Sequence, residues 1–205
     1  MARGKFIVLE GGEGSGKSEM QERLKKTLPK DTVFTRDPGG VSIGEEIRNL
    51  VLSQAARGID PATELLLFLA ARAQLVAELI APALEEGRNV ICDRFILSTI
   101  AYQIYGRQRV DYLALTKNVF DAIKLKCVPD ATIFLDVSPE IGLQRVKLRM
   151  QAPNRFDEED MAFHQRIREG YKQHLDDFGK TVVIDANKPL EEVWTDVQNA
   201  VQSVL

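Results

Sequence analysis

The segment Phe6-Ile7-Val8-Leu9-Glu10-Gly11-Gly12-Glu13-Gly14-Ser15-Gly16-Lys17-Ser18 decides the fold of this chain. It opens with an apolar run typical of a buried strand, and residues 17–28 have helical periodicity. Between the two, residues 11–18 fit the pattern G-x-x-x-x-G-K-[ST] completely. A strand, a glycine-rich loop and a helix in this order predict a phosphate-binding loop, so we expect the chain to bind a nucleoside triphosphate. A chance glycine-rich turn is the alternative, and the preceding apolar strand argues against it.

Each residue type in this loop has a physical reason. Glycines let successive backbone N–H groups turn toward phosphate oxygens, and the helix N-terminus adds the positive end of its dipole. Lys17 would reach the β- and γ-phosphates, and the Ser18 hydroxyl would bind Mg²⁺. We therefore expect the nucleotide-binding residues to be Gly11, Gly12, Glu13, Gly14, Ser15, Gly16, Lys17 and Ser18.

Strand-like and helical segments alternate along the rest of the chain, which is the pattern of an α/β fold with a parallel sheet. We expect strands at residues 5–10, 32–36, 89–92, 131–137 and 181–185. Asp60-Pro61 and Ser138-Pro139 each combine an N-cap residue with proline at the first helical position. The expected helices are residues 17–28, 42–53, 61–86, 110–126, 139–149, 158–176 and 189–204.

Length and composition indicate a folded enzyme-sized unit. The 205 residues suit one domain, 44% of them are hydrophobic, and the formal net charge of -3 gives no general attraction to nucleic acid or an anionic membrane. The two cysteines are too few for a disulfide framework. Because no secretory or membrane segment stands out, we expect a soluble cytoplasmic protein.

Three further segments suggest a small-molecule acceptor, and Arg36 and Arg94 in two of them imply that it already carries a phosphate. Arg36-Asp37-Pro38-Gly39-Gly40 places a cation at the carboxyl edge of the sheet, where α/β proteins bind ligands. Asp93 could hold Mg²⁺ through water, and Arg94 could bind a phosphate in a forked geometry. After Arg94, hydrogen-bonding side chains suited to a sugar or base edge follow at Ser98, Thr99, Tyr102 and Gln103. A plain turn and a surface ion pair are the structural alternatives.

The third segment pairs Phe68 with Arg72, which lie on one helix face because they are four residues apart. Phe68 would stack on a base, and Arg72 would donate to its carbonyl oxygen. A core phenylalanine with an outward-pointing arginine is an equally good interpretation of these two residues alone.

Residues 149–160 are polar, charged and interrupted by Pro153, which indicates an exposed mobile lid. Arg149 and Arg155 lie in it, and arginines that close over a transferring phosphoryl group lower the barrier. A solvated charged loop is the alternative. The guanine-reading segment of GTPases is absent, since Asn187-Lys188-Pro189-Leu190 lacks the required aspartate.

With these residues assembled, the chain closely resembles the bacterial thymidylate kinases over essentially its full length. The resemblance rests on Phe6–Gly11, the phosphate loop, Arg36–Gly40, Leu65–Arg72 and Asp93–Gln103. It implies a doubly wound fold of the P-loop NTPase type, with a five-stranded parallel sheet flanked by helices. It also implies a homodimer that uses ATP and Mg²⁺ to convert dTMP to dTDP for DNA synthesis.

The resemblance also implies a role for each matching residue. Phe68 would stack on thymine and Arg72 would bond its edge, with Thr99 and Gln103 lining the base pocket. Tyr102 would lie beside the deoxyribose. Arg36 and Arg94 would hold the acceptor phosphate, and Glu13 would approach the sugar hydroxyl or the metal. The catalytic residues would then be Lys17, Glu13, Arg94, Arg149 and Arg155. The substrate would be bound by Arg36, Pro38, Phe68, Arg72, Arg94, Ser98, Thr99, Tyr102 and Gln103. The metal would be bound by Ser18 and Asp93.

One residue departs from the family pattern. Members often have a second hydroxyl residue after Ser18, whereas this chain has Glu19, whose effect on ATP depends on the direction in which it points. Two other functions stay open from the sequence: another nucleoside or nucleotide kinase, and a non-catalytic nucleotide-binding regulator. The paired Arg36 and Arg94 argue against the first, and retention of Lys17 and Asp93 argues against the second.

Overall fold

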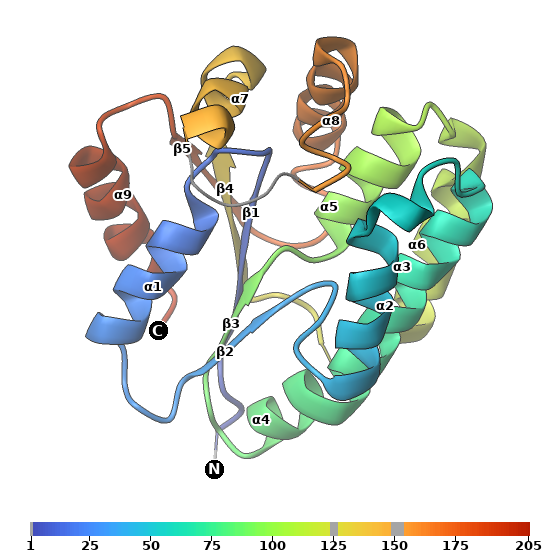
Figure 1. The fold of residues 1–205 in the computed structure, drawn as a ribbon. Helices are drawn as coiled ribbons and strands as arrows, with labels where there is room; N and C mark the ends of the chain where they lie inside the picture. The colour runs from blue at the N-terminus through green and yellow to red at the C-terminus, as the bar shows by residue number, and fades with distance from the viewer. Residues whose placement is uncertain (1, 124–126, 149–153) are drawn as a thin grey trace.

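The computed structural model describes residues 2–123, 127–148 and 154–205. Within them, five parallel strands form one sheet in the order β2-β3-β1-β4-β5 (Figure 1). The strands are β1 (Phe6–Gly11), β2 (Val33–Arg36), β3 (Val90–Asp93), β4 (Ala131–Asp136) and β5 (Thr181–Asp185). The α/β fold with a five-stranded parallel sheet is thus confirmed, and the expected strand ends differ from the observed ones by one residue at most.

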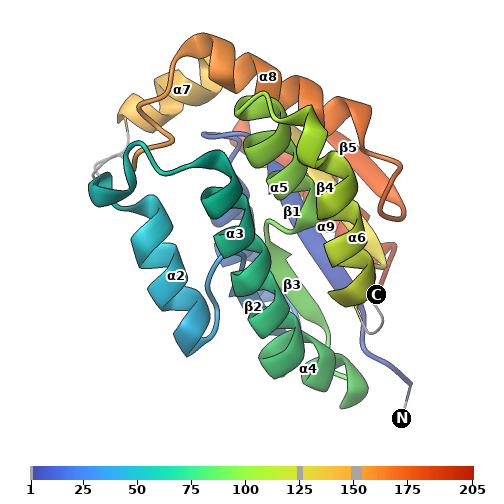
Figure 2. The same cartoon turned by 90° about the vertical axis from the view of Figure 1, so that its right-hand side faces the viewer.

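Helices cover both faces of this sheet. α1 (Lys17–Thr27) and α9 (Leu190–Gln202) lie on one face, and α2 (Ser42–Leu52) and α3 (Pro61–Leu75) lie on the other (Figures 1 and 2). The remaining helical segments are η1 (Gln54–Ala56), η2 (Val76–Ile80), α4 (Ala81–Glu85), α5 (Ile96–Thr99), η3 (Ile100–Gly106), η4 (Val110–Tyr112), α6 (Leu113–Ile123), α7 (Pro139–Leu148) and α8 (Met161–Gln173).

The central strand explains why the sheet is covered on both sides. Every residue of β1 is buried, and its side chains alternate between two hydrophobic clusters. Phe6 and Val8 pack toward α3 and α4, whereas Ile7 and Leu9 pack toward α1 and α9. β1 also separates the strands that follow it in the chain, so the phosphate loop leaves the sheet at the point where strand order reverses.

Three of the expected helices differ from those observed. The run expected at residues 61–86 contains a π-helical turn at Val76–Ile80, because Pro82 lacks an N–H donor and the widened turn accommodates its ring. The helix expected from residue 158 begins only at Met161, since the Asp160 carboxylate caps it by accepting the Phe163 N–H. The segment 110–126 starts as the 3₁₀ turn η4, and its last three residues lie outside the described ones. A further helical segment, Ile96–Gly106, was not among the expected helices.

The helical run Pro61–Glu85 is long and apolar enough to cross a membrane by length and composition. Half of its most apolar window is nevertheless buried inside the protein. Leu75, Ile80 and Leu84 of this run pack into the cluster beneath β1 and β3. It is therefore the core helix of a soluble fold.

Candidate active site

The phosphate loop between β1 and α1 has a backbone that requires glycine. Gly14 has a φ of +68°, and a Cβ there would lie 2.1 Å from the Gly142 carbonyl oxygen of α7. Gly16 is the N-cap of α1 with a φ of 93°, and no described side chain caps the helix. The first N–H groups of α1 are therefore open to an anion, as expected from the sequence.

Lys17 lies inside this loop and is almost completely buried. Its ammonium group donates to the carbonyl oxygens of Gly11 and Gly12 at 2.9 and 3.0 Å and to the Ser15 hydroxyl at 3.1 Å. Burial, assisted by the nearby charge of Arg94, lowers the pKa of Lys17 to about 8. The loop carbonyls offer this buried cation only their dipoles. A bound triphosphate would place full negative charge beside it.

Ser18 and Asp93 are the residues expected to bind Mg²⁺. Ser18 is exposed at the first turn of α1, and Asp93 ends β3 opposite Leu9 of β1. The buried Oδ1 of Asp93 has no hydrogen-bond partner among the described residues. That part of the chain also holds no cluster of three acidic, cysteine or histidine ligands. One carboxylate and one hydroxyl suit an ion bound mainly by phosphate and water.

Glu19 points away from the phosphate loop. Its carboxylate accepts a hydrogen bond from Arg23 Nε at 2.8 Å, one helical turn farther along α1. Arg23 also forms a two-bond pair with Glu191 of α9. The negative charge that departs from the family pattern is therefore held by an arginine.

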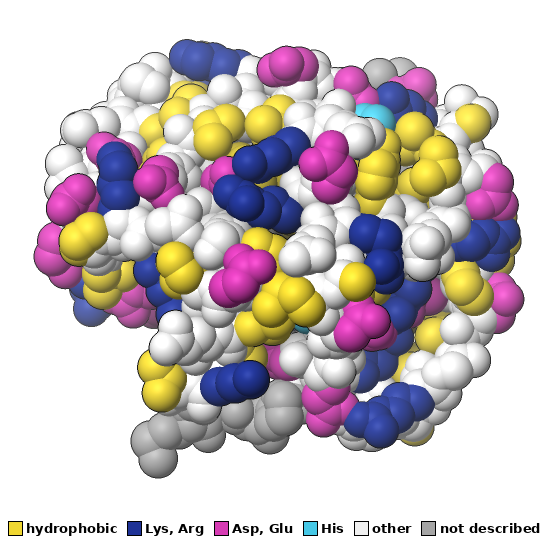
Figure 3. Space-filling view, turned by 90° about the horizontal axis from the view of Figure 1, so that it is seen from above, with side chains coloured by type: hydrophobic (Ala, Val, Ile, Leu, Met, Phe, Trp, Pro, Cys, Tyr) yellow, Lys and Arg dark blue, Asp and Glu magenta, His cyan; other side chains and the backbone are white. Residues whose placement is uncertain are grey.

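A pocket opens beside the loop at the carboxyl end of the sheet. Seen from above, Lys and Arg side chains lie across the middle of this face (Figure 3). The volume of the pocket is about 60 Å³. It is lined by Glu13, Asp37, Pro38, Arg48, Phe68, Arg72, Arg94, Ser98, Thr99, Tyr102, Gln103, Asn154 and Phe156. The structure thus brings together all but one of the residues expected to bind substrate.

Arg72 is fixed in the wall of this pocket and is only 1% exposed. Its Nε donates to Asp37 at 2.5 Å, and its Nη2 donates to the Phe95 carbonyl oxygen and to the Thr99 hydroxyl. Its Nη1 has no hydrogen-bond partner within the described part of the chain. A buried unsatisfied donor costs about 1–3 kcal/mol, so this atom is prepared for an acceptor on a ligand.

Arg94 lies between the pocket and the phosphate loop. Its guanidinium donates to the Gly11 carbonyl oxygen at 2.8 Å and to Glu13 at 2.9 Å, and it lies 4.8 Å from the centre of the Tyr102 ring. Tyr102 in turn donates its hydroxyl to Glu13 at 2.9 Å. Arg94 has a φ of 71°, an uncommon value for a residue with a side chain, which is typical of functional sites.

Two residues that position Arg94 were missed by the sequence analysis. Glu10 is buried at the end of β1 and accepts from the N–H groups of Phe95 and Ser98 and from the Ser98 hydroxyl. Burial raises the pKa of this carboxyl group. Tyr171 of α8 places its hydroxyl within 3.0 Å of Arg94 Nη1. A lone carboxylate in an otherwise apolar strand was the available signal for Glu10; the sequence held none for Tyr171.

Arg36 is the expected substrate residue that is absent from the described pocket lining. Its guanidinium is paired with Glu45 at 2.8 Å, and half of the side chain is exposed. Arg48 of α2 lies in the pocket instead and donates to the Pro38 carbonyl oxygen at 2.8 Å. It is four residues from the buried Gly44, so helical periodicity could have revealed that it faces inward.

Of the two expected lid arginines, Arg149 lies outside the described residues and Arg155 is buried. Arg155 donates to the Val51 carbonyl oxygen and, at 2.7 Å, to Glu64 of α3. It lines a neighbouring cavity with Arg57, Arg107 and Glu158 rather than the acceptor pocket. The next residue, Phe156, does line that pocket and packs edge-on against Phe68.

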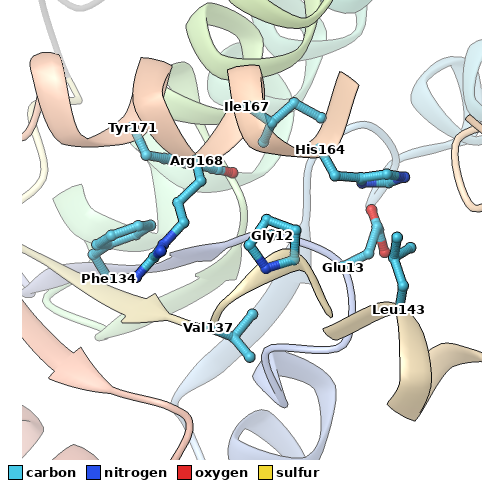
Figure 4. A pocket seen from close by; sticks show the side chains of 10 residues that line it. Gly12, Glu13, Phe134, Val137, Leu143, His164, Ile167, Arg168 and Tyr171 are labelled. Carbon is cyan, nitrogen blue, oxygen red and sulfur yellow. The ribbon is translucent and has the colours of Figure 1, made fainter. Parts of the chain in front are cut away.

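A second, small cavity of about 20 Å³ lies between the phosphate loop and α8 (Figure 4). His164 of α8 points toward Glu13 from one side, and Val137 and Leu143 close the other side (Figure 4). Burial lowers the pKa of His164, so the ring is neutral at pH 7. The sequence analysis had assigned no role to His164 or to this cavity.

Comparison with known proteins identifies the family of this chain. The thymidylate kinase family model matches residues 9–197. A thymidylate kinase of Clostridium novyi is 40% identical, over 97% of this chain and 98% of the relative. One from Alkalilimnicola ehrlichii is 42% identical, over 100% of this chain and 95% of the relative.

This chain belongs to the thymidylate kinase family. A crystal structure of thymidylate kinase from Ehrlichia chaffeensis matches with a TM-score of 0.74 and 34% identity, covering 98% of this chain and 99% of that one. The resemblance inferred from the motifs, the fold and the assignment to the ATP-dependent nucleoside monophosphate kinases are thereby confirmed.

Proposed function

We propose that the described site phosphorylates dTMP to dTDP with ATP. The observation that carries the site assignment is Arg72, whose buried Nη1 lacks a described partner in a pocket that Phe68 also lines. Thymine has a flat apolar face for Phe68 and a carbonyl oxygen for Arg72. Membership of the thymidylate kinase family supports the same reaction.

Within this proposal, the base lies between Phe68 and the side chains of Thr99 and Gln103, with Tyr102 beside the deoxyribose. Arg94 and Arg48 are the pocket cations that can hold the acceptor phosphate, and Pro38 shapes the wall near them. Arg36 would join them only after leaving Glu45. Arg94 also touches the phosphate loop through Gly11, so one guanidinium lies between donor and acceptor sites.

Transfer would be direct and in line, without a covalent enzyme intermediate. An acceptor phosphate is already anionic near neutral pH, so positioning and charge neutralisation are the main contributions of the protein. Lys17 and the first N–H groups of α1 would hold the donor phosphates, and Ser18 and Asp93 would hold Mg²⁺, which supplies further charge neutralisation when bound. Glu13, already bonded to Arg94 and Tyr102, would lie near the sugar hydroxyl or the metal.

The segment at about residues 149–160 would act as a lid within a single catalytic domain of residues 1–205. Arg149 and Arg155 are its candidate catalytic arginines. Closure over the phosphates would require Arg155 to exchange Glu64 for the transferring phosphoryl group. A closed lid would also exclude water as a competing acceptor.

A second copy of the chain is the proposed partner. An apolar groove between α3 and α6 is lined by Leu66, Leu69, Val119 and Ile123, and Leu66 is 54% exposed. Exposed apolar side chains gathered on one face favour an interface. Leu66→Glu should convert a homodimer into monomers in multi-angle light scattering, and wild-type monomers would refute the assembly. A cytoplasmic location fits the proposed role in DNA precursor synthesis.

The acceptor can be tested by measuring ADP production with ATP and Mg²⁺ against dTMP, dUMP, UMP, AMP, GMP and thymidine. A strong preference for dTMP is expected. Turnover of thymidine or of another monophosphate in preference to dTMP would overturn the assigned acceptor pocket, and no turnover with any acceptor would favour a non-catalytic role.

A further inference from the structure

Glu64 of α3 is a buried carboxylate outside the set of residues that bind substrate. It is 1% exposed and accepts hydrogen bonds from three side chains. Arg155 Nη2 donates at 2.7 Å, Gln103 Nε2 at 3.1 Å and Arg107 Nε at 3.2 Å. Two arginines therefore face this carboxylate, and one of its contacts goes directly to the base pocket.

These contacts determine which way the Gln103 amide points. A carboxylate facing two guanidinium groups only accepts hydrogen bonds, so Gln103 must turn its NH₂ group toward Glu64. Gln103 is itself 1% exposed, and rotation of the amide would bring two oxygens together away from water. Because Gln103 lines the acceptor pocket, its carbonyl oxygen is the polar atom left for a ligand.

An acceptor at Gln103 and a donor at Arg72 match one pyrimidine better than the other. Thymine offers an N3–H donor next to a carbonyl oxygen, whereas cytosine offers a bare N3 next to an amino group. The unpartnered Nη1 of Arg72 therefore suits thymine O4, and the Gln103 oxygen suits N3–H. Cytosine would place donor against donor and acceptor against acceptor, which is how buried polar groups reject a wrong base.

We propose that Glu64 is a positioning residue that fixes the Gln103 amide and thereby sets the preference for thymine over cytosine. This inference rests on the proposed base pocket. Glu64 does not touch the base; it acts through Gln103, and Arg107 keeps it in place when the lid arginine moves away.

Glu64→Gln tests the inference because it keeps the size of the side chain. Glu64 Oε2 faces Arg155 and Arg107, whereas Oε1 faces Gln103 and Arg107 Nε. The new amide should keep its oxygen on the Oε2 side, where the shortest contact lies, and turn its NH₂ toward Gln103. Gln103 would then rotate and present NH₂ to the base.

The readout is the ratio of kcat/KM for dTMP to kcat/KM for dCMP. We expect this ratio to fall about tenfold in Glu64→Gln, mainly through a higher KM for dTMP, with the KM for ATP unchanged. An unfolded fraction lowers both rates alike, so it cancels in the ratio. Glu159→Gln is the matched control: it removes the same charge from a partner of Arg107 that forms no hydrogen bond with Gln103 in the described part of the chain, and its ratio should stay at the wild-type value.

Gln103→Leu separates this inference from the pocket on which it rests. Its ratio should fall as in Glu64→Gln, and the double variant should show no further loss. A wild-type ratio in Glu64→Gln beside a reduced ratio in Gln103→Leu would overturn the role of Glu64 alone. Equal losses for dTMP and dCMP in Glu64→Gln would assign it a purely structural role. A wild-type ratio in Gln103→Leu would overturn the base pocket itself.

Discussion

The phosphate loop is one continuous run of residues, whereas the acceptor pocket is lined by side chains spread between residues 13 and 156. The loop presents backbone N–H groups and needs glycine where φ is positive, as at Gly14 and Gly16. The pocket presents guanidinium groups, and those of Arg72 and Arg94 are each held by a carboxylate, as is that of Arg36 outside the pocket. The donor site is thus defined by backbone conformation, and the acceptor site is defined by which ion pairs form around the ligand.

The largest effect is expected at the donor site, from Lys17→Ala. Loss of the ammonium that we propose meets the β- and γ-phosphates should lower kcat by roughly a thousandfold or more, while the fold persists. Steady-state turnover and a thermal melt check both parts. Retained turnover would mean that the loop backbone alone suffices, and an unfolded variant would mean that Lys17 is structural.

The next effect concerns the lid. Arg155→Ala should lower kcat by roughly a hundredfold if, as we propose, the arginine stabilises charge that develops only during transfer. Its KM for dTMP should change little, and Arg155→Lys should restore part of the rate. Normal turnover with weakened dTMP binding would remove Arg155 from the catalytic role.

The loop depends on local backbone conformation, whereas the pocket depends on side chains from distant parts of the chain. This difference explains how much of each region could be predicted from the sequence. The glycine spacing of residues 11–18 specifies a conformation locally, so the loop, its lysine and the flanking strand and helix were all predicted. Most members of the acceptor pocket were also expected at the site, because they lie in the motifs after β2 and β3 and in the Phe68–Arg72 pair of α3. Four members of its lining were not expected there: Asp37, Arg48, Asn154 and Phe156.

The ion-pair partners of the predicted arginines could not be predicted from sequence motifs. Nothing local to Arg155 indicates that Glu64, on a distant helix, would bury it, and nothing local to Arg36 distinguishes Glu45 from a phosphate as its partner. Such choices depend on which side chains the tertiary fold brings within hydrogen-bonding distance.

A smaller effect is expected for the pH dependence of ATP affinity, and it concerns the donor site rather than the acceptor site. Burial lowers the pKa of Lys17 from 10.5 to about 8, so the unliganded lysine loses its proton above that pH. Bound phosphate favours the charged form, and ATP binding above pH 8 must therefore take up a proton. Affinity for ATP should weaken by roughly an order of magnitude between about pH 7.5 and 9.

Isothermal titration in buffers of different ionisation enthalpy would detect this proton uptake. Lys17→Arg is the matched control, because a guanidinium keeps its proton over this range and its affinity should depend less on pH. Equal pH dependence in both proteins would show that another group titrates.

The smallest effect is expected for Glu19→Thr. Because Arg23 holds the Glu19 carboxylate away from the loop, the KM for ATP should change by less than about twofold, a size typical of exposed ion pairs. Initial rates at varied ATP measure it. A marked fall in this KM would show that Glu19 repels the nucleotide despite its pairing.

A crystal structure with dTMP bound tests the central claim most directly. The account predicts that thymine packs against Phe68 and that Arg72 Nη1, which lacks a described partner here, lies within hydrogen-bonding distance of a base oxygen. A base bound elsewhere, or an Arg72 Nη1 still without an acceptor in the complex, would contradict the acceptor site.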